Sequence, residues 1–141
     1  MRVLGIDVGE RRIGLAISDA SRTLARPLAT LTLGPDDALD RLTREIARLA
    51  DEEGGLETIV VGLPARLDGS PNEQTPRVAL LIEALKTRTA IPIVCEDERL
   101  TSREAESRLA IRERDWRKRK ARLDAAAAAI ILQDYLDREN M

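Results

Sequence analysis

Residues 4–19 read LGIDVGERRIGLAISD. A short apolar run ends in a lone carboxylate, Asp7, and alternating apolar residues resume after the turn at Gly9. The pattern predicts two neighbouring strands, over residues 2–7 and 12–19. In sheets that contain parallel strands, functional groups gather at the carboxyl ends of the strands. Asp7 lies at such an end and is a candidate functional residue, although an Asp here could equally cap the turn.

Strand and helix patterns alternate through the rest of the chain. Strands are expected at 24–32, broken near Pro27, at 57–62 and, as a buried strand, at 91–96; helices are expected from about 37 to 52, at 73–88, from 101 or 102, and at 123–137. Short connections predict an antiparallel arrangement for the first three strands, whereas strands that follow helices should be parallel. We therefore expect an α/β fold, with one mixed five-stranded sheet flanked by helices in a single domain, residues 1–141.

Composition narrows the classes of protein to consider. Hydrophobic residues make up 43% and charged residues 34%, which indicates a soluble globular chain rather than a disordered one. No apolar run approaches the roughly 18 residues that a membrane span requires, and we expect neither a signal peptide nor a membrane partner. The single cysteine, Cys95, should lie buried in its strand and fits a reducing compartment. We expect a cytoplasmic location.

The chain contains no histidine. It therefore lacks the most common general base and the most common transition-metal ligand. Hydrolytic chemistry would have to rely on carboxylates, on a metal held by carboxylates, or on Lys, Ser or Cys. Because oxygen ligands suit hard cations, the expected metal is Mg²⁺ or Mn²⁺ rather than Zn²⁺.

Basic residues are concentrated in one segment, residues 112–122, which reads RERDWRKRKAR. It carries a charge of +5 in a chain whose formal net charge is −2, which favours a local anionic partner. Candidate contacts to nucleic acid in and near this segment are Trp116, Arg117, Lys118, Arg119, Lys120 and Arg122, together with Arg11 and Arg12 on the turn beside Asp7. Trp116 could stack on a base or anchor the segment; Arg11 and Arg12 could contact phosphates or simply be solvated.

Acidic residues occur at three places that this order of elements should bring together. Asp7 ends the first strand, residues 96–98 follow the last strand, and Asp124 opens the final, alanine-rich helix. Turn and helix capping would explain each of them separately. Carboxylates that converge without histidine suit a two-metal site that cleaves a phosphodiester.

Four stretches resemble the YqgF/RuvX family, whose members have the ribonuclease H-like fold and are relatives of the RuvC Holliday junction resolvases. They are GIDVGERRIGLAISD (5–19), VVGLPARLDGS (60–70), DERLTS (97–102) and KARLDAAAAAIILQDYL (120–136). The resemblance extends over nearly the whole chain. It implies a metal-dependent endonuclease, a hydrolase that processes the 5′ end of precursor 16S ribosomal RNA or resolves Holliday junctions.

The resemblance places the family's catalytic, metal-binding acids on Asp7, Glu98 and Asp124. The chain departs from the RuvC relatives at two positions: strand four ends without an acid, and Ala127 stands where a second helical acid would be. Three carboxylates rather than four are therefore expected. A module that binds structured RNA or branched DNA without cutting it is the alternative, and a resolvase would further require a two-fold homodimer. The absence of a P-loop motif argues against an ATPase.

Overall fold

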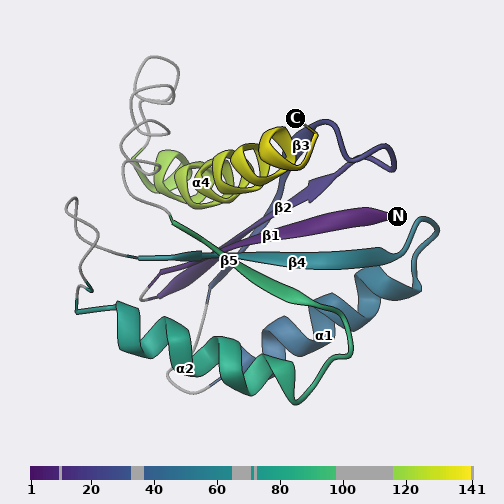
Figure 1. Ribbon diagram of the computed structural model, residues 1–141. Coiled ribbons are helices and arrows are strands. Elements are labelled where there is room, and N and C mark those ends of the chain that lie inside the picture. The colour runs from purple at the N-terminus through teal and green to yellow at the C-terminus, as the bar shows by residue number, and fades with distance from the viewer. Residues whose placement is uncertain (10, 33–36, 65–70, 72, 98–115, 141) are drawn as a thin grey trace.

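A computed structural model describes residues 1–9, 11–32, 37–64, 71, 73–97 and 116–140, with the side chains of the last helix described from Asp124 onward. The elements are β1 (Arg2–Val8), β2 (Arg12–Ser18), β3 (Ala25–Thr32), α1 (Ala38–Asp51), β4 (Leu56–Leu63), α2 (Thr75–Lys86), β5 (Ile93–Asp97) and α4 (Trp116–Glu139). The sheet separates α1 and α2 on one face from α4 on the other (Figure 1). None of the described helices is long and apolar enough to cross a membrane.

The sheet has the predicted mixed topology, with strand order β3-β2-β1-β4-β5. The β1–β2 and β2–β3 pairs are antiparallel, whereas β4 pairs in parallel with both β1 and β5. The expected break near Pro27 is a register irregularity between β2 and β3, because Leu15 pairs with Ala29 while Ala16 pairs with Pro27. The prediction of fold class is thus confirmed.

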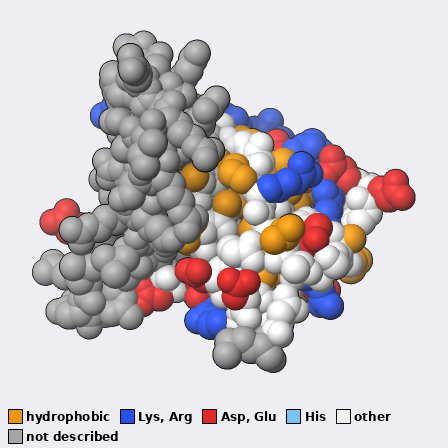
Figure 2. Space-filling view, turned by 90° about the horizontal axis from the view of Figure 1, so that it is seen from above, with side chains coloured by type: hydrophobic (Ala, Val, Ile, Leu, Met, Phe, Trp, Pro, Cys, Tyr) orange, Lys and Arg blue, Asp and Glu red, His pale blue; other side chains and the backbone are white. Residues whose placement is uncertain are grey.

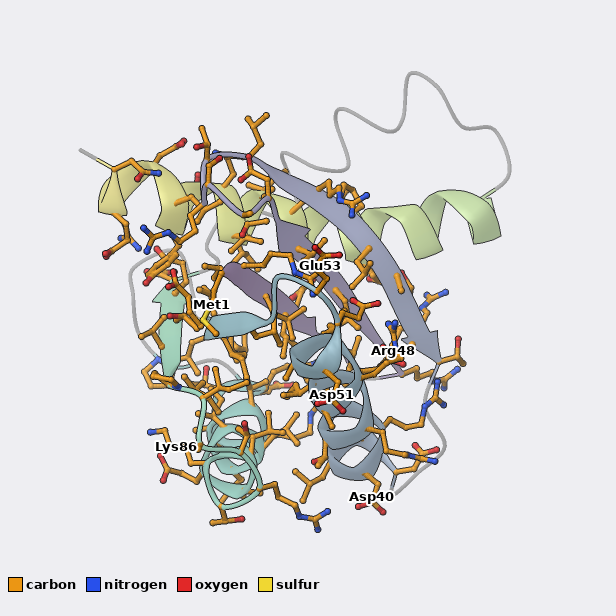
Figure 3. The ribbon with its side chains drawn as sticks, turned by 90° about the vertical axis from the view of Figure 1, so that its right-hand side faces the viewer. Met1, Asp40, Arg48, Asp51, Glu53 and Lys86 are labelled. Atoms are coloured by element: carbon orange, nitrogen blue, oxygen red, sulfur yellow. The ribbon has the colours of Figure 1, made fainter. Side chains whose placement is uncertain are left out.

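Strand alternation divides the core into two layers. On β1, Leu4, Ile6 and Val8 pack in the larger apolar cluster with residues of α1 and α2. Val3 packs in the second cluster, against Ile131 and Leu132 of α4. Because side chains alternate along a strand, Gly5 and Asp7 share the α4 face with Val3. Figure 3 shows α1 and α2 side by side beneath the sheet, with Asp40 and Lys86 on their outer surface and Arg48 on the side of α1 toward β3.

Two glycines on the α4 face allow the helix backbone to lie directly against the sheet. A Cβ atom at Gly14 of β2 would be only 1.9 Å from the carbonyl oxygen of Asp124, and one at Gly5 would be 2.8 Å from the Cβ of Leu132. These distances are far inside van der Waals contact, so no other residue fits at Gly14 without moving α4. The contact fixes where Asp124 lies relative to β1 and β2.

Two predictions were wrong. The final helix begins at Trp116 rather than near residue 123, so the basic residues 117–122 are part of α4 and Asp124 lies inside the helix instead of opening it. Arg, Lys and Ala are good helix formers, and a run of charge does not by itself end a helix. Cys95 is exposed rather than buried, because β5 is an edge strand.

Replacing Gly14 with alanine should destabilise the fold by about 3 kcal/mol, because overpacking forces α4 away from β2. Gly5→Ala should cost less, since part of its clash is with the side chain of Leu132 rather than with backbone. Urea unfolding of both variants would show whether Gly14→Ala loses more stability than Gly5→Ala. A Gly14→Ala protein as stable as the Gly5→Ala protein would contradict the close approach of α4.

Candidate nucleic-acid cleavage site

The fold brings Asp7 and Asp124 to the same rim and the same face of the sheet. Asp7 pairs with Gly14 across the β1–β2 ladder, and Gly14 lies against the backbone carbonyl of Asp124. Asp7 occupies the penultimate position of β1, at the carboxyl end where ligands bind in sheets of this kind. Both acids therefore adjoin Gly14, and this glycine is what brings their positions together.

Arg12 joins this pair from the first position of β2. Its Nε lies 3.1 Å from Oδ2 of Asp124, and the two side chains are only 23% and 22% exposed. Arg12 lies two residues before Gly14 on β2, so its side chain is on the same face of the sheet as Gly14 and Asp7. It is a diagonal neighbour of Asp7 across the two strands. The sequence left a contact to phosphate and simple solvation open for Arg12; the structure adds an ion pair with a candidate catalytic carboxylate.

The turn between β1 and β2 is also held from the opposite face. The amide of Gly9 donates to the carbonyl of Arg12 at 2.8 Å, which closes the hairpin. The carbonyl of Gly9 accepts from Arg77 of α2 at 3.1 Å, and Arg77 also donates to Gln74. Sequence reasoning missed Arg77, because a contact across 68 residues leaves no local pattern. The turn that follows Asp7 is thus fixed by α2 below and, through Arg12, by α4 above.

Glu96 lies in register with Asp7, two strands away across Gly62. Its side chain is buried and forms an ion pair with Arg138 near the end of α4. Burial raises the pKa of Glu96 above its usual value, the Arg138 guanidinium opposes that rise, and the charges of Asp134 and Asp97 add to it. Glu96 therefore ties the edge strand to α4, consistent with its omission from the candidate ligands.

The other predicted residues are Glu98, Arg11 and the residues at the start of α4. Glu98 lies outside the described residues, and β5 ends one residue before it. Arg11 is exposed on the turn. The backbones of Trp116, Arg117, Lys118, Arg119, Lys120 and Arg122 form the first two turns of α4. Seen from the α4 side, the described surface carries intermixed acidic and basic side chains (Figure 2).

A hollow of about 460 Å³ lies at the other end of the sheet. It is lined by Arg2, Arg26, Leu28, Arg48, Leu49, Glu52 and Glu53; Arg48 and Glu53 are labelled in Figure 3. Because Arg2 begins β1 and Asp7 lies near its end, this hollow is separate from the candidate site. Its charges are mixed, with three arginines facing two glutamates.

The donor atoms at the candidate site fit a hard divalent cation. Asp7 and Asp124 offer carboxylate oxygens on one face, and Mg²⁺ is typically held in proteins by one or two carboxylates together with phosphate oxygens and water. Among the described residues no group of three or more His, Cys, Asp or Glu side chains could hold a metal ion. Any third carboxylate ligand would thus have to come from outside the described residues.

Comparison with known proteins identifies the family. Residues 1–138 match the family model described as "RuvX: Holliday junction resolvase". The chain belongs to the RuvX family. A protein of Chloroflexus aurantiacus named "Putative pre-16S rRNA nuclease" is 43% identical over 135 residues, covering 96% of this chain and 86% of that protein. One of the same name from Anaeromyxobacter is 42% identical and covers 97% of both chains.

Solved structures support the ribonuclease H-like fold of this RuvX chain. RuvC of Thermus thermophilus, in complex with a Holliday junction substrate, superposes with a TM-score of 0.58 at 18% identity, covering 99% of this chain and 96% of RuvC. The fowlpox virus resolvase, in complex with Holliday junction DNA, gives 0.61 at 9% identity over the full length of both chains. At such identities the likeness concerns the fold alone.

The Glu96–Arg138 ion pair should make the stability of the fold depend on pH. Because the folded-state pKa of Glu96 is raised, its contribution to stability is present below its unfolded pKa and lost as the pH rises through the folded value. Replacing Arg138 with methionine should raise that pKa further. The variant should therefore lose about 2 kcal/mol of unfolding free energy at pH 7, and much less at pH 4, where Glu96 is protonated.

Denaturant unfolding at both pH values measures this difference. The matched background is Glu96→Gln, in which Arg138→Met should cost the same at pH 4 and pH 7. An equal cost at both pH values in the otherwise native chain would show that the Glu96 carboxylate does not depend on Arg138.

Proposed function

We propose that this RuvX protein is a metal-dependent endonuclease that cleaves phosphodiester bonds in structured nucleic acid. Its proposed substrate is precursor 16S ribosomal RNA, processed at the 5′ end during ribosome biogenesis in the cytoplasm by a single domain that spans residues 1–141. The family match and the names of its relatives support this choice. Resolution of Holliday junctions is the second candidate, favoured by the description of the family.

One observation carries the proposal: the glycine that pairs with Asp7 is the glycine on which Asp124 rests. Two acids from opposite ends of the chain therefore share one face at the carboxyl end of β1. Bringing like charges together costs free energy unless cations compensate, and Arg12 supplies one such charge. A site that assembles carboxylates in this way is suited to binding divalent cations at a phosphodiester.

In the proposed mechanism, Asp7, Asp124 and Glu98 would hold Mg²⁺ or Mn²⁺. The chemistry that such an ion would supply is activation of a water molecule and stabilisation of the leaving oxygen of the phosphodiester. The protein's own contribution is positioning. Gly14 fixes the distance of Asp124 from β2, and the Arg77 contact to Gly9 holds the turn that follows Asp7.

The basic residues of α4 are the proposed surface for the nucleic acid. They are Arg117, Lys118, Arg119, Lys120 and Arg122, with Trp116 proposed to stack on an unpaired base and Arg11 to meet a phosphate on the turn. Because residues 116–123 continue into the same helix as Asp124, a strand bound along this segment leads directly to the candidate acids. The two functions therefore share one rigid element.

Cleavage of two model substrates with Mn²⁺ tests the reaction. A structured RNA with a 16S 5′ leader should be cut, and Asp7→Asn or Asp124→Asn should slow cutting by at least about a hundredfold, because the metal contributes several kcal/mol to the barrier. Asp40→Asn is the matched control: it removes the same charge from the outer surface of α1, where Asp40 pairs with Arg88. Circular dichroism would verify that each variant folds.

The outcomes separate the candidates. Cleavage of a four-way DNA junction in preference to the RNA, by a protein that sediments as a dimer, would favour the resolvase. Tight binding without cleavage of either substrate would favour a binding module that lacks catalysis. Native rates in both Asn variants would remove these residues from the reaction.

Binding should depend steeply on salt. Each phosphate neutralised contributes roughly one unit to the slope of log affinity against log salt. Replacing Lys118 and Lys120 with glutamine should lower that slope by about two units. The same two-charge change at Arg44 and Lys86, which are exposed on α1 and α2, should leave it unchanged. Fluorescence anisotropy across a salt series measures the slope for both double variants. Equal slopes for the two would show that the basic segment of α4 does not contact the nucleic acid.

A further inference from the structure

The ion pair between Arg12 and Asp124 lies at the candidate metal ligand itself. Arg12 Nε is 3.1 Å from Oδ2 of Asp124, and more than three quarters of each side chain is buried. At that distance the guanidinium occupies one of the directions from which a cation would approach the carboxylate. Two positive charges this close repel each other strongly in a partly buried site.

We propose that Arg12 is a resident cation on Asp124 that a divalent metal ion must displace in order to bind. This inference rests on the proposed function, in which Asp124 is a metal ligand. Only exchange for another cation, or movement of the guanidinium to another anion, removes it from the carboxylate.

Backbone contacts hold Arg12 in β2 independently of its side chain. The backbone of Arg12 is held in β2 by pairing with Thr32, and its carbonyl accepts the amide of Gly9. Arg77 holds the carbonyl of Gly9 from the other face of the sheet. An exchange at Asp124 therefore requires rotation of one long side chain, not a rearrangement of the turn that follows Asp7.

A released guanidinium remains at the rim where the nucleic acid is proposed to bind. Guanidinium groups form strong, often paired, hydrogen bonds to phosphate oxygens. The substrate and the metal ion then both favour movement of the Arg12 guanidinium away from Asp124. The phosphate attracts the guanidinium, and the metal ion takes its place on the carboxylate. Metal binding to the protein alone is weakened by the cost of displacing Arg12.

Metal affinity measured without substrate tests this inference. Isothermal titration with Mn²⁺, supported by the electron paramagnetic resonance signal of free Mn²⁺, should give about tenfold tighter binding for Arg12→Gln than for the native chain. Arg44→Gln is the matched control, because it removes the same charge from an exposed side chain on α1, away from the candidate site. Its effect should stay within about twofold, since exposed charges are screened by salt.

Arg12→Lys gives a second reading, because it keeps the charge while losing the planar guanidinium. Its Mn²⁺ affinity should lie between those of the native chain and Arg12→Gln. Thermal unfolding verifies that the variants fold. Affinity of Arg12→Gln equal to or weaker than that of Arg44→Gln would overturn the inference, since Arg12 would then orient Asp124 rather than compete for it.

Failure of the metal site itself gives a different result. In that case Arg12→Gln and the double variant Arg12→Gln/Asp124→Asn would bind Mn²⁺ equally weakly, which overturns the proposed function and this inference together. Native binding that Asp124→Asn abolishes and Arg12→Gln leaves unchanged overturns the inference alone.

Discussion

The close approach of α4 to the first two strands is the constraint on which the rest of the structure depends. Side chains normally keep a helix and a sheet apart by the thickness of a packed layer, but Gly5 and Gly14 remove that layer where α4 crosses β1 and β2. The helix backbone then rests on the strands, and Ala128 and Leu132 complete the contact. Any residue at the level of Gly14 on α4 must lie at the rim beside Asp7, and that residue is Asp124.

Two acids on this face of the sheet pair with arginines from a different element. Asp124 of α4 pairs with Arg12 of β2, and Glu96 of β5 pairs with Arg138 of α4. Burial of a carboxylate costs free energy unless a charge or hydrogen bonds compensate for it. The two arginines provide that compensation, which allows the acids to be buried against the sheet. They differ in position: Arg138 is largely exposed, whereas Arg12 is enclosed beside a candidate ligand.

Local pattern predicted the strands and their directions well, because alternation along β1 separates Leu4, Ile6 and Val8 from the face that carries Asp7. It also predicted that Asp7 and Asp124 would lie at the same rim of the sheet, and both residues adjoin Gly14. It failed where a residue's neighbours are distant in sequence. The burial of Glu96, the exposure of Cys95 and the contact of Arg77 with Gly9 all follow from strand order and helix placement. The start of α4 was misplaced because charge was interpreted as a loop signal.

The row of residues that crosses the sheet at Asp7 limits what a metal site there can be. Gly14 and Gly62 flank Asp7 on its two neighbouring strands, so neither strand contributes a ligand beside it. The next position in the row, Glu96, is committed to Arg138. A cation bound by Asp7 and Asp124 would therefore have few protein ligands and would take much of its coordination from water and substrate phosphate. In such a site metal and nucleic acid bind cooperatively, because each completes the binding site of the other.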